Sequence, residues 1–509
     1  MPSSTQPPAL LLWHQRPAVR FFLLGLSKVA AGWHMLSVLY LAPRPETFGG
    51  RFWCARPQPA LTSYKSGSPL DDPCQGNVAV HYLNGSNASF EYFSECKEFH
   101  FEIIKPTMVS EWSLVCSRDF LVNVVQLGYL LGIFAGGFAT ASLQQRFSPR
   151  ILFVVAVLLQ VLAGVGSALV PTFEMHFVLK MFTGLGVCIT FTVAFNSISQ
   201  QHSRFGPDEL LGVMFEHWWS VGVISLGWLH QLAPSWRVLQ LMISLPSLLL
   251  LLTYWVLPQK SNLCSLLGTE ETEVLTYNKQ SKKVISFVWW HYWCLQVMWL
   301  VTIFNYYGAL LNLKNVSAKI PLPVRTTLAG VAEMLGATVG LFILLQRGKS
   351  QFNFLSVLLF AGGSSCVLTW PFLLKGIGSD WTILVMVLAG RVAIACSMAI
   401  LQNGVSVDPE VGLVLLSSGR LFLQAAPFSN SMFAKWGRLP ASSFYGMLCL
   451  VAAISALLMA KSTEWRSCQP THRRMPNCVL ATNLSSKNFC ERCSSAKDSL
   501  QNVPFSQET

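Results

Sequence analysis

The chain has 509 residues, of which 52% are hydrophobic and only 12% are charged. Soluble globular domains carry roughly a quarter charged residues, about twice this share. The composition therefore excludes a soluble enzyme and a disordered chain, and the net charge of +12 indicates basic loops beside an anionic lipid bilayer rather than a nucleic-acid partner.

Twelve apolar runs are long enough to cross a hydrocarbon core of about 30 Å, which takes about 20 residues. The first six are Val19–Ala42, Leu121–Ala141, Ile151–Val170, Phe173–Asn196, Glu209–Leu232 and Trp236–Leu257. The second six are Val284–Gly308, Val324–Gln346, Phe352–Leu374, Trp381–Val405, Val411–Phe433 and Leu439–Ala460. The alternative for the first run is a signal peptide cleaved near Ala30-Ala31-Gly32; its length and Lys28 favour a retained helix.

These runs predict an all-α polytopic membrane protein with five parts. The parts are a cytoplasmic N-terminus (1–18), an N-terminal six-helix half (19–257), a cytoplasmic connector (258–283), a C-terminal six-helix half (284–460) and a cytoplasmic, disordered tail (461–509). The tail contains Cys468, Cys478, Cys490 and Cys493; free thiols are expected there rather than a zinc site, because only the last pair has ligand spacing. The tail is also a candidate site for a cytoplasmic partner.

The segment 43–120, between the first two runs, has the features of an extracellular loop. It holds four cysteines, Cys54, Cys74, Cys96 and Cys116, which allow three disulfide pairings, and two glycosylation sequons at Asn84 and Asn87. A third sequon, at Asn315, lies between the seventh and eighth runs. With twelve spans and a cytoplasmic N-terminus, both sequon-bearing segments fall outside the cell.

The two halves repeat several features at corresponding positions. The second run carries Gly128, Gly132 and Gly136 at four-residue spacing, and the eighth carries Gly336 and Gly340. Such spacing lets helix backbones approach closely in lipid. Each of these runs ends in a basic turn, with Arg146 and Arg150 in the first half and Arg347 in the second; Lys180 in the fourth run corresponds to Arg391 in the tenth. Two parallel six-helix repeats predict a secondary transporter whose site lies between the halves.

The chain resembles the solute carrier 22 family of organic cation and anion transporters, within the major facilitator superfamily, from about Val19 to Ala460. The motifs that carry the resemblance are Ser110–Cys116 (SEWSLVC), Ser235-Trp236-Arg237, Ala31–Met35 (AGWHM), Lys180–Gly184 (KMFTG) and Tyr306-Tyr307-Gly308. The resemblance implies the major facilitator fold and transport of small organic ions by alternating access.

The cytoplasmic gating motifs depart from the family pattern. The turn after the second run reads Gln145–Arg150 (QRFSPR), where the family carries an Asp-Arg-x-Gly-Arg core, and the acidic motif after the tenth run is reduced to Val407–Glu410 (VDPE). Family members form ion pairs with these charges when the inward gate is latched. Their loss identifies a divergent member and motivates an alternative function, that of a non-transporting receptor or scaffold.

Ionisable side chains inside the spans are the first candidates for a substrate site, because each costs about 2.5–3.5 kcal/mol to insert. Arg420 in the eleventh run matches the position where the family's anion transporters carry an arginine and its cation transporters an aspartate; a guanidinium suits a carboxylate or sulfate. The alternative is a structural ion pair with Glu333 in the eighth run. Glu333 itself favours a second alternative for the function, namely an organic cation transporter. Lys28 either faces the cavity or extends to the interface.

The remaining candidates are aromatic or basic. Tyr306, Tyr307 and Trp218 are expected to stack on the organic body of a substrate, whereas Lys180, Arg391, Arg146, Arg150 and Arg347 are expected to be gating or structural residues. The sequence contains no nucleotide, metal or catalytic motif, so neither a cofactor nor an enzymatic activity is expected. We therefore expect a plasma-membrane carrier of organic ions, with anions favoured.

Overall fold

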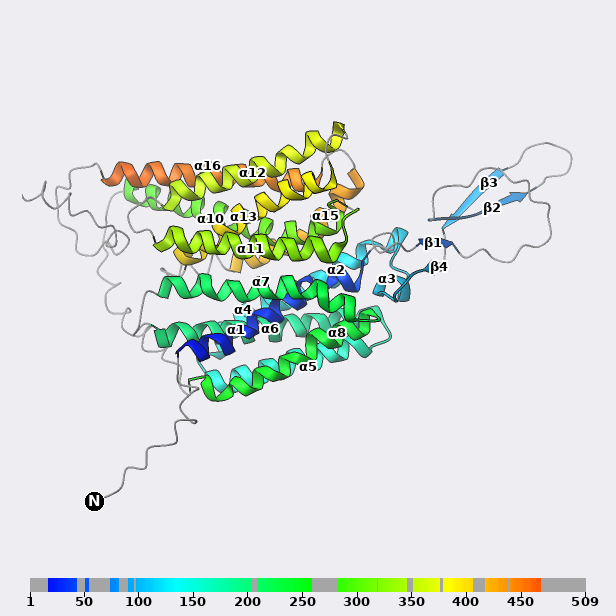
Figure 1. The fold of residues 1–509 in the computed structure, drawn as a ribbon, viewed down its shortest axis with the longest axis horizontal. Coiled ribbons are helices and arrows are strands. Elements are labelled where there is room, and N and C mark those ends of the chain that lie inside the picture. The colour runs from blue at the N-terminus through cyan, green and yellow to red at the C-terminus, as the bar shows by residue number, and fades with distance from the viewer. Residues whose placement is uncertain are drawn as a thin grey trace, which may run out of the picture.

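Apolar runs in a bilayer must satisfy their backbone hydrogen bonds internally, and in the computed structural model of this chain they do so as α-helices (Figure 1). The structure describes residues 17–43, 51–54, 74–81, 90–95, 98–202, 208–258, 282–317, 319–345, 351–375, 379–405, 417–436 and 440–467. The predicted sequons at Asn84 and Asn87, together with Cys96, Arg347 and the tail beyond Ser467, lie outside these residues.

Helices α1 to η5 form the N-terminal group. Their bounds are α1 Pro17–Leu36, α2 Val38–Leu41, α4 Phe120–Leu143, α5 Pro149–Leu169, α6 Phe173–His202, α7 Asp208–Leu232, α8 Trp236–Ser244 and the 3-10 helix η5 Leu245–Val256. Short elements α3 (Met108–Glu111) and η4 (Cys116–Arg118) precede α4. Side-chain oxygens of Ser148 and Ser235 accept from backbone N–H groups in the first turns of α5 and α8, so each helix begins at a capping serine.

Helices α10 to α16 form the C-terminal group. Their bounds are α10 Lys282–Leu311, the 3-10 turn η7 Asn312–Asn315, α11 Leu322–Leu345, α12 Gln351–Lys375, α13 Asp380–Val405, α15 Ala426–Trp436 and α16 Ala441–Ser467. Residues 417–423 are also helical, and a turn at Gln424 and Ala425 separates them from α15. Pro427 explains this break, because proline has no N–H for the Leu423 carbonyl four residues earlier and its ring crowds that carbonyl.

The packing pairs of the two groups correspond helix by helix. In the N-terminal group α4 packs on α6, α1 on α6, and α5 on α8 and η5; in the C-terminal group α11 packs on α13, α10 on α13, and α12 on α16. Figure 1 shows the groups on opposite sides of the bundle, with α7 and α11 facing each other between them. The predicted internal duplication is therefore visible in the packing as well as in the sequence.

The spaced glycines lie where two helices touch. A Cβ on Gly132 of α4 would overlap the Met181 carbonyl of α6, and one on Gly336 of α11 would overlap the Val392 carbonyl of α13. Gly136 is similarly close to Cys188, where a Cβ would lie 2.7 Å from the Cys188 Cβ. These contacts confirm the expected close approach of helix backbones, at equivalent places in the two groups.

Among the described residues, nine helices are long and apolar enough to cross a membrane. Helices α1 and α7 fall outside that set, although both run through the bundle beside α4 and α6 (Figure 1). Their hydropathy is lowered by the polar side chains they carry, Lys28 and His34 in α1 and Glu216 and His217 in α7. These two helices pack on each other in the N-terminal group.

Four short strands project from one end of the bundle, which we call the strand end (Figure 1). Strand β1 (Arg51–Cys54) pairs antiparallel with β4 (Phe99–Glu102), and β2 (Gln75–His81) pairs antiparallel with β3 (Phe90–Glu95). These strands belong to the segment predicted to be extracellular. A disulfide joins Cys74, next to β2, to Cys116 in η4, which ties the strand region to the start of α4.

Candidate functional site

The two helix groups meet along two seams. Helix α7 packs on α11 and α13, and α4 packs on α15. In the first seam the helices approach closely at Gly330, where a Cβ would lie 2.6 Å from Ile224 Cγ1. Charged side chains are concentrated around this seam, although each is costly to bury in a membrane protein. The seam is therefore the place to look for a functional site.

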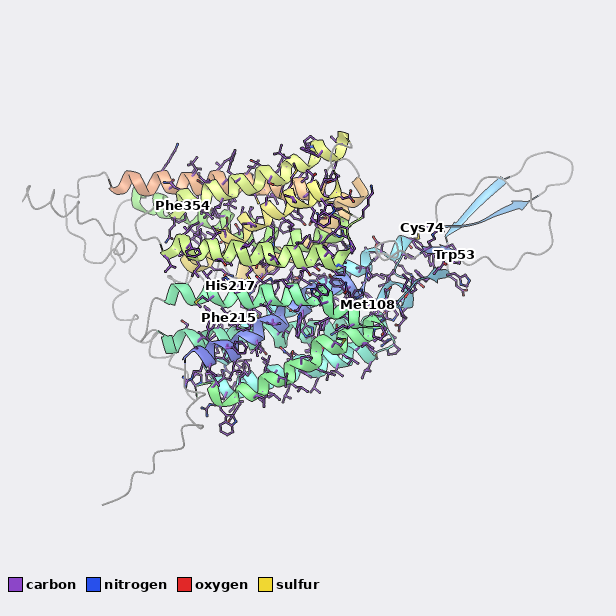
Figure 2. All side chains as sticks on the ribbon, viewed as in Figure 1. Trp53, Cys74, Met108, Phe215, His217 and Phe354 are labelled. Carbon is purple, nitrogen blue, oxygen red and sulfur yellow. A yellow bond between two sulfur atoms is a disulfide. The ribbon has the colours of Figure 1, made fainter. Side chains whose placement is uncertain are left out.

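An ion pair within the N-terminal group lies beside the seam. Lys28 Nζ of α1 is 2.7 Å from Glu216 Oε1 of α7. The ammonium also lies over two aromatic rings, 4.7 Å from the centroid of Phe191 and 5.5 Å from that of Phe215 (Phe215 is labelled in Figure 2). Lys28 is buried rather than extended to the interface.

A second ion pair lies within the C-terminal group, and it corrects one expectation. Glu333 Oε2 of α11 is 2.9 Å from Arg391 Nη2 of α13, so the alternative in which Glu333 pairs with Arg420 is wrong. The Arg391 guanidinium also donates to the Tyr306 carbonyl and lies 4.1 Å from the centre of the Tyr306 ring. Arg391, at the equivalent of Lys180, thereby neutralises the one buried carboxylate of the described residues.

Arg420 lies at the other seam. Its guanidinium touches Gly137 of α4, at a place where any side chain larger than glycine would collide with it. Among the residues that the structure describes, no carboxylate lies within 4.0 Å of this guanidinium, so its charge is not neutralised by an ion pair. Arg420 is half-buried, between the two helix groups.

A small cavity lies between the two carboxylates. It is lined by Glu216, Ser220, Tyr306, Glu333, Ala337, Ala395, Met398, Ala399 and Gln402. Residues of both helix groups therefore line it, with α7 on one side and α10, α11 and α13 on the other. The space is enough for about one water molecule, so an organic ion requires the groups to move apart.

The predicted aromatic residues divide between two places. Tyr306 and Tyr307 of α10 lie edge to face at 5.0 Å, and the Tyr307 ring meets the Trp219 ring of α7 at 5.6 Å across the seam. Trp218, by contrast, packs against Phe22 of α1 at 4.9 Å and does not line the cavity. Its neighbour Trp219, rather than Trp218, faces the C-terminal group.

His217 joins the two groups further along the same seam. Its Nε2 is 3.0 Å from the Thr338 hydroxyl of α11, and its Nδ1 is 2.9 Å from the Val213 carbonyl (His217 is labelled in Figure 2). Near the same end of α7, the Gln402 amide of α13 donates to Glu216 at 3.4 Å. Side-chain contacts from α7 to α11 and α13 therefore also join the two groups beside the cavity.

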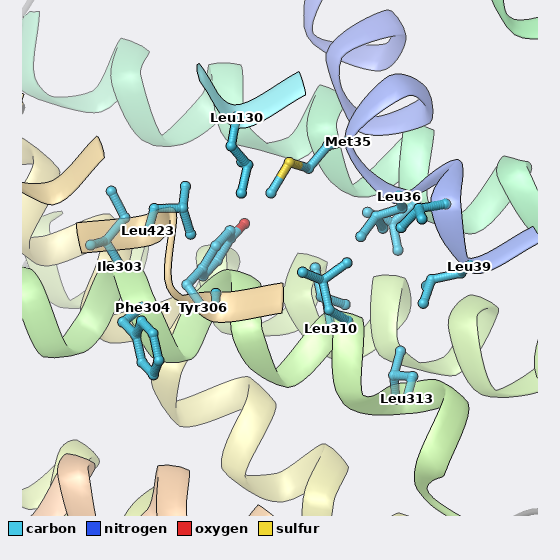
Figure 3. Close-up of a cluster of buried hydrophobic side chains, with 14 of the residues drawn as sticks. Met35, Leu36, Leu39, Leu130, Ile303, Phe304, Tyr306, Leu310, Leu313 and Leu423 are labelled. Carbon is cyan, nitrogen blue, oxygen red and sulfur yellow. The ribbon is translucent and has the colours of Figure 1, made fainter. Parts of the chain in front are cut away.

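Apolar packing closes the interface toward the strand end. Figure 3 shows Met35, Leu36 and Leu39 of α1 and α2 and Leu130 of α4 facing Leu310 and Leu313 of the C-terminal group, with Tyr306 and Leu423 beside them. Beyond this layer, the buried Tyr40 hydroxyl is 2.5 Å from the Thr326 hydroxyl of α11. The sequence provided no specific signal for this contact, because a tyrosine and a threonine near helix ends are common.

The predicted gating residues differ in their surroundings. Lys180 is fully buried, and its ammonium donates to the Ser37 hydroxyl at 3.1 Å and to Gln240 Oε1 at 2.8 Å. Arg150 donates from Nε to the Leu257 carbonyl at 2.8 Å and so joins α5 to the end of η5, whereas Arg146 is exposed.

Two sequence motifs meet at the strand end. Glu111 of SEWSLVC accepts from the Trp236 indole at 2.7 Å and forms an ion pair with Arg237. Trp112 donates to the Pro171 carbonyl at 2.9 Å. Partial burial would raise the pKa of the Glu111 carboxyl, but the hydrogen bonds from Arg237 and Trp236 and the charge of Arg237 outweigh it and hold that pKa below its ordinary value.

The site residues that sequence reasoning missed are polar but uncharged. Ser220 and Gln402 line the cavity, yet single serines and glutamines occur in many apolar helices and carry no distinguishing pattern. Among the described residues, no group of three His, Cys, Asp or Glu side chains is arranged to hold a metal ion.

Known proteins share this fold and parts of this sequence. Among solved structures, a D-xylose–proton symporter matches with a TM-score of 0.57 at 13% identity over 86% of this chain and 96% of its own. The xylose transporter XylE from E. coli, in a partially occluded inward-open conformation, matches with a TM-score of 0.55 at 13% identity, over 90% of this chain and 98% of its own. These matches show that the chain has the fold of the major facilitator superfamily.

The sequence comparisons lead to transporters of organic ions. The profile of a family described as "Sugar (and other) transporter" matches residues 78–265. An organic cation transporter-like protein of Drosophila melanogaster is 24% identical over 52% of this chain and 47% of its own length. Solute carrier family 22 member 3 of Mus musculus is 25% identical over 47% of this chain and 48% of its own length. Organic anion transporter 3 of Sus scrofa is 27% identical over 47% of this chain and 44% of its own length.

The chain spans about half the length of the curated relatives it matches. The matching relatives are organic cation and anion transporters, which bears out the resemblance drawn from the SEWSLVC and SWR motifs. The chain is therefore a multi-pass membrane protein with the major facilitator superfamily fold, related in sequence to the organic cation and anion transporters of solute carrier family 22.

Proposed function

We propose that the protein is a carrier for small organic anions that works by alternating access between its two helix groups. The observation that carries the proposal is Arg420, a guanidinium at the seam between the groups with no described carboxylate beside it. A guanidinium can bind a carboxylate or sulfate through two parallel hydrogen bonds. The anionic group of the substrate supplies the negative charge that pairs with this guanidinium.

The balance of charge inside the bundle also favours an anion. Among the described residues, the buried or half-buried charges within the bundle include five basic side chains, Lys28, Lys180, Arg325, Arg391 and Arg420, and two acidic ones, Glu216 and Glu333. Both carboxylates already hold a cation. Because uncompensated charge is costly in a low-dielectric interior, an excess of basic groups attracts anions and disfavours organic cations.

The other proposed substrate contacts lie at the first seam, where α7 packs on α11 and α13. Tyr306 and Tyr307 offer aromatic faces to the organic body of the anion once the groups separate, while the pairs Lys28–Glu216 and Glu333–Arg391 hold their helices on either side of it. Trp218 supports α1 from behind. The sequons at Asn84, Asn87 and Asn315 and the disulfide-bonded strand region are typical of an extracellular surface, which suits the plasma membrane.

The test is a counterflow uptake screen in proteoliposomes with a mixed panel of organic anions and cations. We expect saturable anion uptake that falls about tenfold or more in Arg420→Ala, because a charge-assisted hydrogen bond contributes about 1.5–3 kcal/mol. Arg420→Lys keeps the charge and is expected to retain part of the uptake. Arg118→Ala removes an exposed basic residue at the strand end, away from both seams, and serves as the matched control.

Three results would contradict the proposal. Cation uptake would reverse the assigned charge of the substrate, and anion uptake that is unchanged in Arg420→Ala would remove that residue from the site. Saturable binding without flux, from folded protein, would favour a receptor that uses the transporter fold.

A further inference from the structure

Each helix group carries one carboxylate at the first seam, and each carboxylate is neutralised within its own group. Lys28 pairs with Glu216 in the N-terminal group, and Arg391 pairs with Glu333 in the C-terminal group. Among the residues that the structure describes, no ion pair crosses between the groups. A buried charge that loses its counter-ion is costly, so we expect each pair to stay together when the groups move.

Two uncharged side chains reach across the seam to these carboxylates. The indole N–H of Trp219 on α7 donates to the Glu333 carboxylate of α11, and the Gln402 amide of α13 donates to Glu216 of α7 at 3.4 Å. We call these two contacts the cross-seam bonds. They are reciprocal, because each group offers the other one neutral donor and one carboxylate that is already paired with a base.

Helix geometry explains how the indole reaches its acceptor. Trp219 lies three residues after Glu216 on α7, so both side chains are on the same face of that helix. The two helices approach closely beside them. A Cβ on Gly330 of α11, three residues before Glu333, would lie 3.2 Å from the Ser220 carbonyl of α7. The short distance between the backbones therefore brings a rigid side chain of one group to the carboxylate of the other.

The cross-seam bonds suit an interface that opens and closes. When the groups separate, each carboxylate keeps the cation of its own group and loses only a neutral donor. An ion pair across the seam would instead leave two buried charges without partners, which costs far more. A hydrogen bond to a charged acceptor is still stronger than one between neutral groups. The bonds therefore favour the closed seam without leaving a bare charge when they break.

We propose that Trp219 and Gln402 are positioning residues that hold the two groups together, each through the carboxylate of the opposite group. Resting on the proposed carrier function, both bonds break whenever the groups separate and form again when they close. Arg420, the proposed anion site, lies at the other seam. The two residues therefore act on how often the groups separate rather than on the contact between the guanidinium and an anion.

The alternative role for both residues is packing alone. The Trp219 ring meets the Tyr307 ring edge to face at 5.6 Å, and Gln402 lines the cavity beside it. Trp219→Phe keeps an aromatic ring against Tyr307 and removes only the N–H donor and part of the ring system. Gln402→Leu keeps a side chain of similar size and removes the amide. These variants therefore separate loss of a hydrogen bond from loss of a packed side chain.

The test measures access of a charged methanethiosulfonate reagent to the seam, with no substrate present. Ser220→Cys places a thiol on the cavity wall, where the serine is fully buried and the space holds about one water molecule. The purified full-length chain is labelled in detergent, and the initial rate at position 220 is followed by mass spectrometry of its peptide. Glu174→Cys, at an exposed position in the first turn of α6, gives the rate of an accessible thiol.

We expect slow labelling at position 220 when Ser220→Cys is the only change. Adding Trp219→Phe should raise the rate about tenfold, because a hydrogen bond to a charged group is among the stronger ones. Gln402→Leu should raise it less, since its bond at 3.4 Å is long. It decides the question where Trp219→Phe does not fold. Trp218→Phe is the matched control, because that ring packs against Phe22 within one group, and it should leave the rate unchanged.

Three results would overturn the proposal. They are a labelling rate that neither Trp219→Phe nor Gln402→Leu changes, an equal rise in Trp218→Phe and Trp219→Phe, and a rate in Ser220→Cys alone that matches the exposed thiol.

Anion uptake, measured in parallel, separates this proposal from the carrier proposal. Faster labelling in the two variants of a protein that takes up no anion would leave the cross-seam bonds in place and overturn the carrier function. Unchanged labelling in a protein that does take up anions would keep the carrier and remove the bonds.

Discussion

At the scale of single residues, the charges inside the bundle differ in how they are compensated. Glu333 and Arg391 form a pair within one group, whereas Lys180 is held by the neutral oxygens of Ser37 and Gln240. Arg420 has neither kind of partner among the described residues, and its guanidinium lies against Gly137. The partners of a buried charge therefore indicate its role. Of these basic residues, Arg420 has the surroundings that best suit an external anion.

Glu111 provides a pH-dependent prediction outside the membrane helices. Its contacts with Arg237 and Trp236 lower the pKa of the carboxyl from the ordinary 4.5, so they stabilise the fold above that pH and are lost as the pH falls through the lowered pKa. We expect Glu111→Gln to reduce stability by about 1 kcal/mol near neutral pH, since the pair is partly exposed. The melting temperatures of wild type and variant should converge as the pH falls below that lowered pKa; a constant difference at every pH would contradict this account.

At the scale of elements, glycines decide how closely the helices of each group pack. Gly132 on α4 and Gly336 on α11 occupy equivalent places, and at both a Cβ would overlap a carbonyl of the neighbouring helix. Backbone cannot move aside as a flexible side chain can. The repeated spacing therefore has a structural cause in each group, α4 against α6 and α11 against α13.

We expect Gly132→Ala to destabilise the N-terminal group by about 1–3 kcal/mol, because the added methyl group forces α4 and α6 apart. Gly212→Ala on α7 is the matched control, since the nearest atom to its Cβ would be Phe195 Cζ at 3.8 Å, an ordinary contact. Thermal melting of both variants in the same detergent checks the prediction. Equal melting temperatures would show that the helices accommodate the methyl group.

At the scale of the whole molecule, the structure is closed at the strand end. The apolar layer around Tyr306 in Figure 3 and the hydrogen bond between Tyr40 and Thr326 join the two groups there. Contacts of His217 and Gln402 also join the groups beside the cavity. In the carrier proposed above, one set of these contacts opens before an anion enters between the groups, which is the requirement of alternating access.

Cross-linking at the strand end tests this requirement. In a Tyr40→Cys/Thr326→Cys variant, a short bifunctional thiol reagent should join α2 to α11 and abolish uptake, because the groups can no longer separate at that end. A reductant that cleaves the cross-link should restore uptake, and each single-cysteine variant treated in the same way should remain active. Uptake that persists after complete cross-linking would show that the strand end does not open during transport.

The sequence by itself determined the class of fold. Runs of about 20 apolar residues can satisfy their backbone only as helices in a bilayer, and the repeated glycines and motifs placed two similar groups in order along the chain. The motifs SEWSLVC and SWR also identified the related transporters. The sequence did not show that the two motifs contact each other through Glu111, Trp236 and Arg237.

Only the tertiary structure decided which charges meet. Glu333 and Arg391 are 58 positions apart, and neither spacing nor hydropathy favoured their pairing over that of Glu333 with Arg420; the crossing of α11 and α13 brings them to 2.9 Å. Likewise Trp219, not Trp218, faces the seam, because one step along a helix turns a side chain by about 100°. Partner choice depends on helix rotation and crossing, which local sequence patterns do not specify.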